Sequence, residues 1–194
     1  YAGPSLHGTV SGDGRLFDAF GEPYLLSYIC LDSLRVADKP VGDIKFAASW
    51  HDGRREMDVN GTVQRDTLRA LEFTGRIAPG RDREQLDLNL LLDDLDLAFI
   101  DPYLPEGVSD IKGELSGTIH VGGMLSEPQV EGTALLKDAG LRIDYLNTFY
   151  SFTDEVRVLP DAFWLDLVPL KDQEGHLAKA TGTINHKGFS KWDY

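Results

Sequence analysis

The sequence predicts a mainly β chain, and three observations support this prediction. From Ile111 to Val121, every odd position is apolar or glycine and every even position is charged or polar. Such alternation gives a strand one apolar and one polar face, because successive side chains point to opposite sides of a sheet. Strand-like segments also recur at the short spacing typical of all-β folds. Triplets of glycine, a threonine or arginine, and an aliphatic residue or alanine begin at Gly8, Gly61, Gly75, Gly117, Gly132 and Gly182.

The first half of the chain contains a series of short strands separated by turn residues. Turns are expected at 12–14, 51–55 and 78–82, where glycine or proline stands beside charged residues. Leu86, Leu88 and Leu90 are expected on one face of their strand. The expected strands are Leu6–Val10, Tyr24–Leu34, Ile44–Trp50, Met57–Val63, Leu68–Ile77 and Gln85–Leu92.

The alternation breaks once, between Asp94 and Leu104, where apolar residues are spaced more nearly as in a helix. Asp94 or Asp96 can cap the start of a helix, and the prolines at 102 and 105 limit its end. The sequence therefore predicts one short helix near residues 94–104.

Alternating segments then resume and continue almost to the end of the chain. Turns are expected at 122–123, 126–128, 138–140 and 172–175. No Ser/Gly-rich linker divides the chain, so we expect a single β unit over residues 1–194 with a weak seam at 78–84. The expected strands are Ile111–Val121, Gln129–Leu136, Leu141–Phe152, Glu155–Leu159, Ala162–Val168 and Leu177–Asn185.

Composition limits the classes of partner. The formal net charge of −13 over 194 residues argues against binding nucleic acid or anionic lipid headgroups by charge. Cys30 is the single cysteine, so it forms no internal disulfide, and we expect a buried thiol. The sequence starts at Tyr1 and stops just after an alternating segment. We therefore expect a piece of a longer repeat protein, with targeting and anchoring segments outside it.

Motifs for enzymatic chemistry are not found. The five histidines show no metal-ligand spacing, and the sequence has no nucleophile elbow, phosphate-binding loop or dinucleotide fingerprint. Asp93, Asp94 and Asp96 raise the alternatives of a calcium site or a glycosidase carboxylate, but the glycine and distal glutamate of a calcium loop are missing. Such a cluster is typical of a helix start or a solvated edge. We therefore expect a non-enzymatic protein without metal or cofactor.

Two architectures can accommodate the apolar face of these strands. Two sheets can close over it as a β-sandwich, which would suit a glycan-binding module or enzyme. Alternatively, one curved sheet can remain open and hold an apolar ligand. Gly113 and Gly117 lie at apolar-face positions, where they would allow tight curvature or leave room for a ligand.

A family resemblance favours the open sheet. Residues from about 95 to 194 resemble the C-terminal domain of the TamB family, the inner-membrane component of the translocation and assembly module in the AsmA-like group. The last block is in the style of Bacteroidetes-type members. The matching blocks are Leu97–Leu104, Val108–Gly117, Ser126–Gly132, Asp138–Thr148, Tyr150–Asp154 and Ala180–His186 with Trp192.

The resemblance implies an elongated curved sheet folded into an open trough, a β-taco, with an apolar interior. It further implies a periplasmic segment of a protein anchored in the inner membrane, with an outer-membrane Omp85-type, TamA-like partner. Phospholipid acyl chains and nascent outer-membrane β-barrel proteins are the implied clients. The side chains expected to line the groove are Leu86, Leu88, Leu90, Ile111, Leu115, Ile119, Val121, Leu141, Ile143, Phe163, Leu165 and Leu167.

Overall fold

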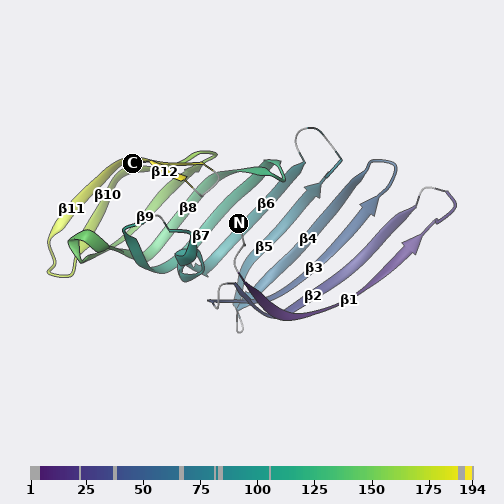
Figure 1. Ribbon diagram of the computed structural model, residues 1–194, viewed down its shortest axis with the longest axis horizontal. Helices are drawn as coiled ribbons and strands as arrows, with labels where there is room; N and C mark the ends of the chain where they lie inside the picture. The colour runs from purple at the N-terminus through teal and green to yellow at the C-terminus, as the bar shows by residue number, and fades with distance from the viewer. Residues whose placement is uncertain are drawn as a thin grey trace. The chain divides into compact units, whose positions relative to one another are not determined.

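The structure is a computed structural model that describes residues 5–21, 23–36, 39–65, 68–80, 82, 85–104, 106–187 and 191–193. Over these residues, twelve strands form one sheet in which each strand neighbours the next in sequence (Figure 1). The sheet is antiparallel and open, and it does not close into a barrel. The predicted mainly β class is confirmed. A closed sandwich does not fit, because every described strand belongs to this one sheet.

Most strands are longer than the sequence pattern predicts, whereas the strand expected at Leu68–Ile77 has those bounds. Among the described residues, no helix has the length and apolar character needed to cross a bilayer. The observed bounds of the strands are β1 (Leu6–Phe17), β2 (Tyr24–Val36), β3 (Lys39–His51), β4 (Glu56–Arg65), β5 (Leu68–Ile77), β6 (Leu86–Asp96), β7 (Val108–Met124), β8 (Glu127–Ile143), β9 (Thr148–Leu159), β10 (Ala162–Asp172), β11 (Leu177–Lys187) and β12 (Lys191–Asp193).

The expected helix near 94–104 is present as a 3₁₀ helix, η1 (Leu97–Tyr103). Asp96 is its N-cap, and its carboxylate accepts a hydrogen bond of 2.8 Å from the backbone N–H of Ala98. A second 3₁₀ turn, η2 (Asp144–Leu146), divides the segment that the sequence pattern presents as one strand, Leu141–Phe152. Asn147 ends η2 in the left-handed conformation, with φ of 48°.

Three of the expected turns are wrong, because they lie inside strands, and one of these is 122–123 within β7. Residues 12–14 are continuous with β1, and residues 138–140 lie within β8. Asp138 has φ of 48° at a register shift between Leu136 and Ala139, and its backbone N–H donates to Thr153 Oγ1 at 2.9 Å. A β-bulge inserts residues without ending a strand, and aspartate tolerates the left-handed conformation that it needs. Turn-like residues therefore mark a bulge at 138–140, whereas at 12–14 they pair with β2 in unbroken register.

The chain divides into two compact units. The first comprises Tyr1–Leu91 and His120–Pro128, and the second comprises Leu92–Ile119 and Gln129–Tyr194. The boundary passes through β6, β7 and β8 and not between two strands. The seam expected at 78–84 lies partly outside the described residues, at 81, 83 and 84.

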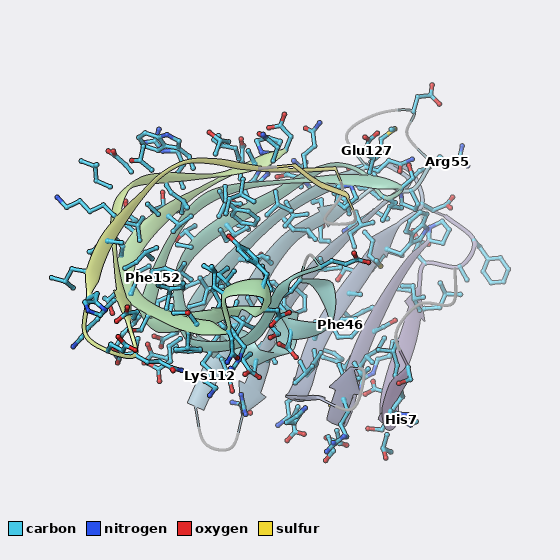
Figure 2. All side chains as sticks on the ribbon, turned by 60° about the vertical axis from the view of Figure 1, so that its left-hand side comes forward. His7, Phe46, Arg55, Lys112, Glu127 and Phe152 are labelled. Carbon is cyan, nitrogen blue, oxygen red and sulfur yellow. The ribbon has the colours of Figure 1, made fainter. Side chains whose placement is uncertain are left out.

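Each unit has a thin core made mostly of small side chains. In the second unit, a single sheet buries one of its faces, and Figure 2 shows the strands of this unit curving around the side chains on their inner surface. The buried apolar residues are Ala48, Val59, Val63, Ala70, Ala78 and Leu86 in the first unit, and Leu92, Leu97, Ile119, Ala134, Ala139, Val156, Val158, Ala162 and Val168 in the second.

Candidate functional site: the apolar face of the sheet

In the first unit, strand register gathers apolar side chains onto one face. Directly paired residues of antiparallel strands share a face, so the printed pairs can be followed from strand to strand. We call the face that carries the following rows the apolar face. The rows are Val10–Leu31–Ile44–Val63–Leu71, Gly12–Ile29–Phe46–Gly61–Phe73, Gly14–Ser27–Ala48–Val59–Gly75 and Leu16–Leu25–Trp50–Met57–Ile77.

Two phenylalanines meet on this face above a glycine. The rings of Phe46 and Phe73 are 6.3 Å apart between centroids and tilted by 51°. A Cβ atom on Gly61 would lie 2.6 Å from Phe73 Cζ and 2.5 Å from Phe46 Cβ. The Phe73 ring therefore reaches over β4 only because position 61 has no side chain.

The apolar face is covered unevenly. Near the middle of the unit Val59 and Val63 are buried, whereas Leu16 and Leu25 at β1 and β2 are 62% and 40% exposed. Val10 is also exposed, and it stands in the same row as Val63. A continuous set of apolar rows thus reaches solvent at β1 and β2, where it can contact an apolar ligand.

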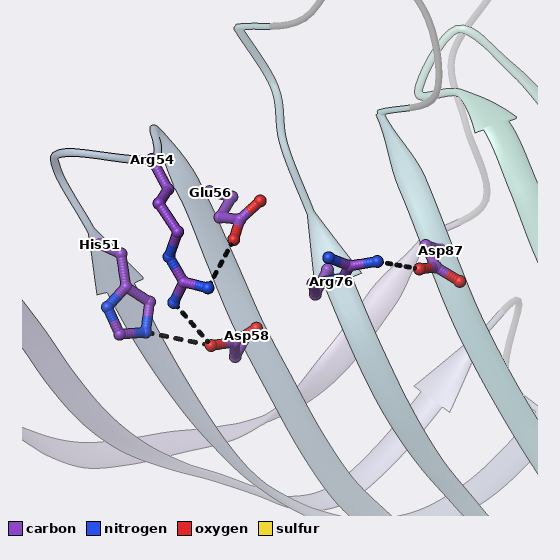
Figure 3. Close-up of polar contacts among 6 residues, drawn as sticks. All are labelled: His51, Arg54, Glu56, Asp58, Arg76 and Asp87. Atoms are coloured by element: carbon purple, nitrogen blue, oxygen red, sulfur yellow. Dashed lines mark hydrogen bonds and ion pairs between the residues drawn. The ribbon is translucent and has the colours of Figure 1, made fainter.

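The opposite face is polar and carries a charge network (Figure 3). Glu56 is only 2% exposed, and its carboxylate lies 3.0 Å from the Arg54 guanidinium. Asp58 accepts from His51 Nε2 at 3.0 Å and lies 3.5 Å from Arg54. Cys30 also lies on this face, between Ser11 and Lys45, and it is partly exposed, so the expected buried thiol is wrong.

A second polar group bridges β5 and β6. Arg76 Nη2 lies 2.7 Å from Asp87, and His120 Nε2 lies 3.3 Å from the other oxygen of the same carboxylate. Hydrogen bonding to Arg76, followed by that to His120, holds the pKa of Asp87 below its usual value. The polar face is thus held by cross-strand ion pairs of the kind that a solvated surface uses.

We expect replacement of Arg76 by methionine to raise the pKa of Asp87 towards its ordinary value. In the wild-type protein the pKa of Asp87 is lower in the folded than in the unfolded state, so the ionised carboxylate stabilises the fold at pH values above the unfolded carboxyl pKa of about 4. This stabilisation is lost as the pH falls through the folded-state pKa. Carboxyl-carbon NMR titration measures the shift. Arg142→Met is the control, because Arg142 pairs with Asp110 in the other unit and should leave Asp87 unchanged. An unaltered Asp87 titration in Arg76→Met would contradict the assignment.

The expected groove residues of β6 extend the apolar face. A Cβ atom on Gly75 would contact the Cα of Leu88, so Leu88 stands opposite Gly75 on this face. Alternation places Leu86 and Leu90 beside it. Leu86 is buried, whereas Leu88 and Leu90 are partly exposed. Val121 is also partly exposed and belongs to the same unit.

In the second unit, β7 and β8 approach each other through glycines. A Cβ atom on Gly132 would lie 3.0 Å from Ile119 Cα and 3.1 Å from Ile119 Cδ1, so the Ile119 side chain covers Gly132. A Cβ atom on Gly113 would lie 2.5 Å from Ala139 Cα. The space at these glycines is therefore occupied by the neighbouring strand and side chain, so it is not free for a ligand. Ile111 and Leu115, on the same strand, are partly exposed.

The remaining expected groove residues lie on β8 and β10. Leu141 and Ile143 pair with Tyr150 and Thr148, and both are partly exposed. Phe163 is paired on one side with Val158 and on the other with Ile184. Leu165 is paired with Gly182 and is partly exposed.

Leu167 is the exception among the expected groove residues. A bulge between Leu165 and Val168 leaves Leu167 with φ of 55°, and its backbone N–H donates to Thr181 Oγ1 at 2.8 Å. Its side chain is 58% exposed, whereas Val168 is 1% exposed. The alternation expected for this strand therefore fails at the bulge, and Val168 takes the inward position.

A scan of protein-family models, a search of curated proteins and a search of solved structures each found no match. The case for function therefore depends on the geometry of the apolar face.

Many side chains of the apolar face are not among those that the sequence predicts to line a groove. Val59, Val63, Phe46 and Phe73 belong to this face in the first unit, and none was among the expected groove residues. Their segments alternate in the sequence, but only the register shows that they share a face.

Asp94, Asp96 and His176 make contacts that stabilise the local structure. The backbone N–H of Asp94 donates to Ser116 Oγ at 3.0 Å, and Asp96 caps η1. His176 Nδ1 lies 2.9 Å from Asp172 in the turn between β10 and β11. Within the described part of the chain, no three His, Cys, Asp or Glu side chains are placed to hold a metal ion.

Proposed function

We propose that the apolar face shields phospholipid acyl chains from water within a segment of a larger, TamB-like envelope protein. The single observation that carries this proposal is the exposure of Val10, Leu16 and Leu25, which lie on the same face of the sheet as the buried core residues Val59 and Val63. A closed core would leave no such strip exposed.

The chemistry of the face suits an acyl chain. Its rows are built of aliphatic and aromatic side chains, while the charge network lies on the opposite face. Removing an acyl chain from water contributes about 0.8 kcal/mol per buried methylene, without requiring a polar anchor. Such a surface binds by area, so it holds chains of different lengths and allows them to slide.

The family resemblance extends the proposal beyond this chain. It implies a periplasmic segment between an inner-membrane anchor and an Omp85-type partner, with assembly of outer-membrane β-barrel proteins as a related role. The observations on the apolar face favour lipid as the client, because they concern side chains and not free strand edges.

Site-specific photo-crosslinking in cells tests the proposal. We expect phospholipid adducts with the probe at Leu16 or Leu25, and none at Arg15 or Tyr28, which are the matched controls because they lie on the polar face of the same two strands. Tyr28 is itself 52% exposed, so accessibility alone would label it. Equal labelling on both faces, or protein adducts without lipid at Leu16 and Leu25, would overturn the proposal.

A further inference from the structure

We propose that the turns at one end of the first unit dock onto the surface of a phospholipid bilayer. This end, which we call the turn rim, comprises residues 18–21, 23, 52–55, 78–80 and 124–126, which lie at or beside the turns after β1, β3, β5 and β7. The inference rests on the proposed function, since it names where lipid would reach the apolar face.

Contacts between neighbouring turns make the turn rim continuous. The backbone N–H of Asp52 donates to the carbonyl of Pro23 at 3.3 Å, which joins the first turn to the second. A Cβ atom on Gly80 would lie 3.9 Å from the Arg55 guanidinium, which joins the second to the third. The backbone N–H of Leu125 donates to Gln85 Oε1 at 3.0 Å, beside the third and fourth turns. The four turns therefore present one surface.

Exposed apolar side chains gather on the turn rim and on the strand ends beside it. Phe20 is fully exposed at the tip of the first turn, and Leu125 is half exposed at the fourth. Behind Phe20, the rings of Phe17 and Tyr24 are stacked at 4.7 Å between centroids. Large side chains of this kind on convex turns fit insertion into a bilayer interface, where aromatic residues are favoured.

The turn rim carries the basic residue Arg55 together with the acidic residues Asp18 and Asp52, a mixture that suits a zwitterionic headgroup surface better than an anionic one. Arg55 is exposed on the turn rim, and Figure 2 shows it at the end of the unit opposite His7. A guanidinium there can bind the phosphate that every phospholipid headgroup carries. The net charge of −13 opposes approach to a strongly anionic membrane. The expected surface is therefore zwitterionic, with phosphate contacts at Arg55 and apolar insertion at Phe20.

Vesicle flotation of the intact chain tests the docking. We expect binding to vesicles of phosphatidylethanolamine and phosphatidylcholine, and weaker binding to vesicles of phosphatidylglycerol. Phe20→Ser should weaken binding about tenfold, since a buried aromatic side chain contributes on the order of 1.5 kcal/mol. Leu125→Ser should add to that loss. Tyr145→Ser is the control, because Tyr145 is also an aromatic residue with a highly exposed side chain, at 83%, but lies on η2 in the other unit.

The possible outcomes separate docking from acyl-chain shielding. Loss of flotation in Phe20→Ser, with Tyr145→Ser unchanged, supports the docking. Undiminished flotation of Phe20→Ser, equal loss in both variants, or no binding by the wild-type chain overturns it. If lipid adducts at Leu25 persist in any of these overturning cases, the docking fails while the proposed function stands. Because Phe20 is fully exposed, its replacement leaves the fold intact, and circular dichroism verifies this.

Discussion

Gly113→Ala is expected to destabilise the second unit by about 3 kcal/mol, because two penalties coincide at this position. Gly113 has φ of 112°, which side chains rarely adopt. An added Cβ would also lie 2.5 Å from Ala139 Cα and 2.8 Å from Asp138 O, both of which are backbone atoms of β8. Backbone in the middle of a sheet cannot move aside as the end of a side chain can, so β7 and β8 would have to separate.

Denaturant unfolding, followed by circular dichroism, measures this effect. Gly53→Ala is the matched control, because a Cβ atom at Gly53 meets nothing within 4 Å. That variant should unfold within about 0.5 kcal/mol of the wild-type protein. Equal stability of the Gly113 and Gly53 variants would show that β7 and β8 do not approach each other as closely as described.

Val168→Asp is expected to cost about 4 kcal/mol or more, whereas Leu167→Asp should change stability by about 0.5 kcal/mol at most. Val168 is 1% exposed, so a carboxylate there would be buried without a partner. Leu167, the next residue along the chain, points into solvent because of the bulge in β10. Substitution by aspartate should therefore strongly destabilise the protein at position 168 and leave its stability almost unchanged at position 167.

Thermal unfolding of the two variants decides which residue faces inwards. If strict alternation held through β10, with Leu165 and Leu167 both inward, Leu167→Asp would be the damaging change. That result would contradict the bulge. If Val168→Asp does not fold, the stabilities of a second pair, Val168→Ala and Leu167→Ala, can be compared in its place, because Val168→Ala removes only methyl groups.

The alternation of β7 shows how much the local sequence can reveal. From Ile111 to Val121, apolar or glycine residues alternate with polar residues at a period of two, which a strand satisfies and a helix does not, so the existence and approximate position of this element follow from side-chain geometry alone. The cap at Asp96 is equally local, because a carboxylate needs only a backbone N–H two residues away. Interactions of this range are contained within a few residues of sequence.

Strand ends and faces depend on longer-range contacts. Asp138 resembles a turn residue in sequence, but pairing of β8 with β9 on both sides of it converts the expected turn into a bulge. The same kind of irregularity exchanges the roles of Leu167 and Val168. A bulge shifts the alternation of every residue after it. A bulge that is missed in the sequence therefore assigns the rest of the strand to the wrong face of the sheet.

The amino-acid sequence by itself determined the β class, the alternating faces and the short capped helix, because these depend on side-chain direction and on contacts between near neighbours. Only the tertiary structure decided that all described strands join one open sheet and that Phe46, Val59 and Val63 belong to its apolar face. It also decided that the glycines of β7 and β8 admit the neighbouring strand and its side chains. These properties arise from register between residues far apart in the chain, and alternation within one strand shows which of its residues share a face but not which residues of another strand stand opposite them.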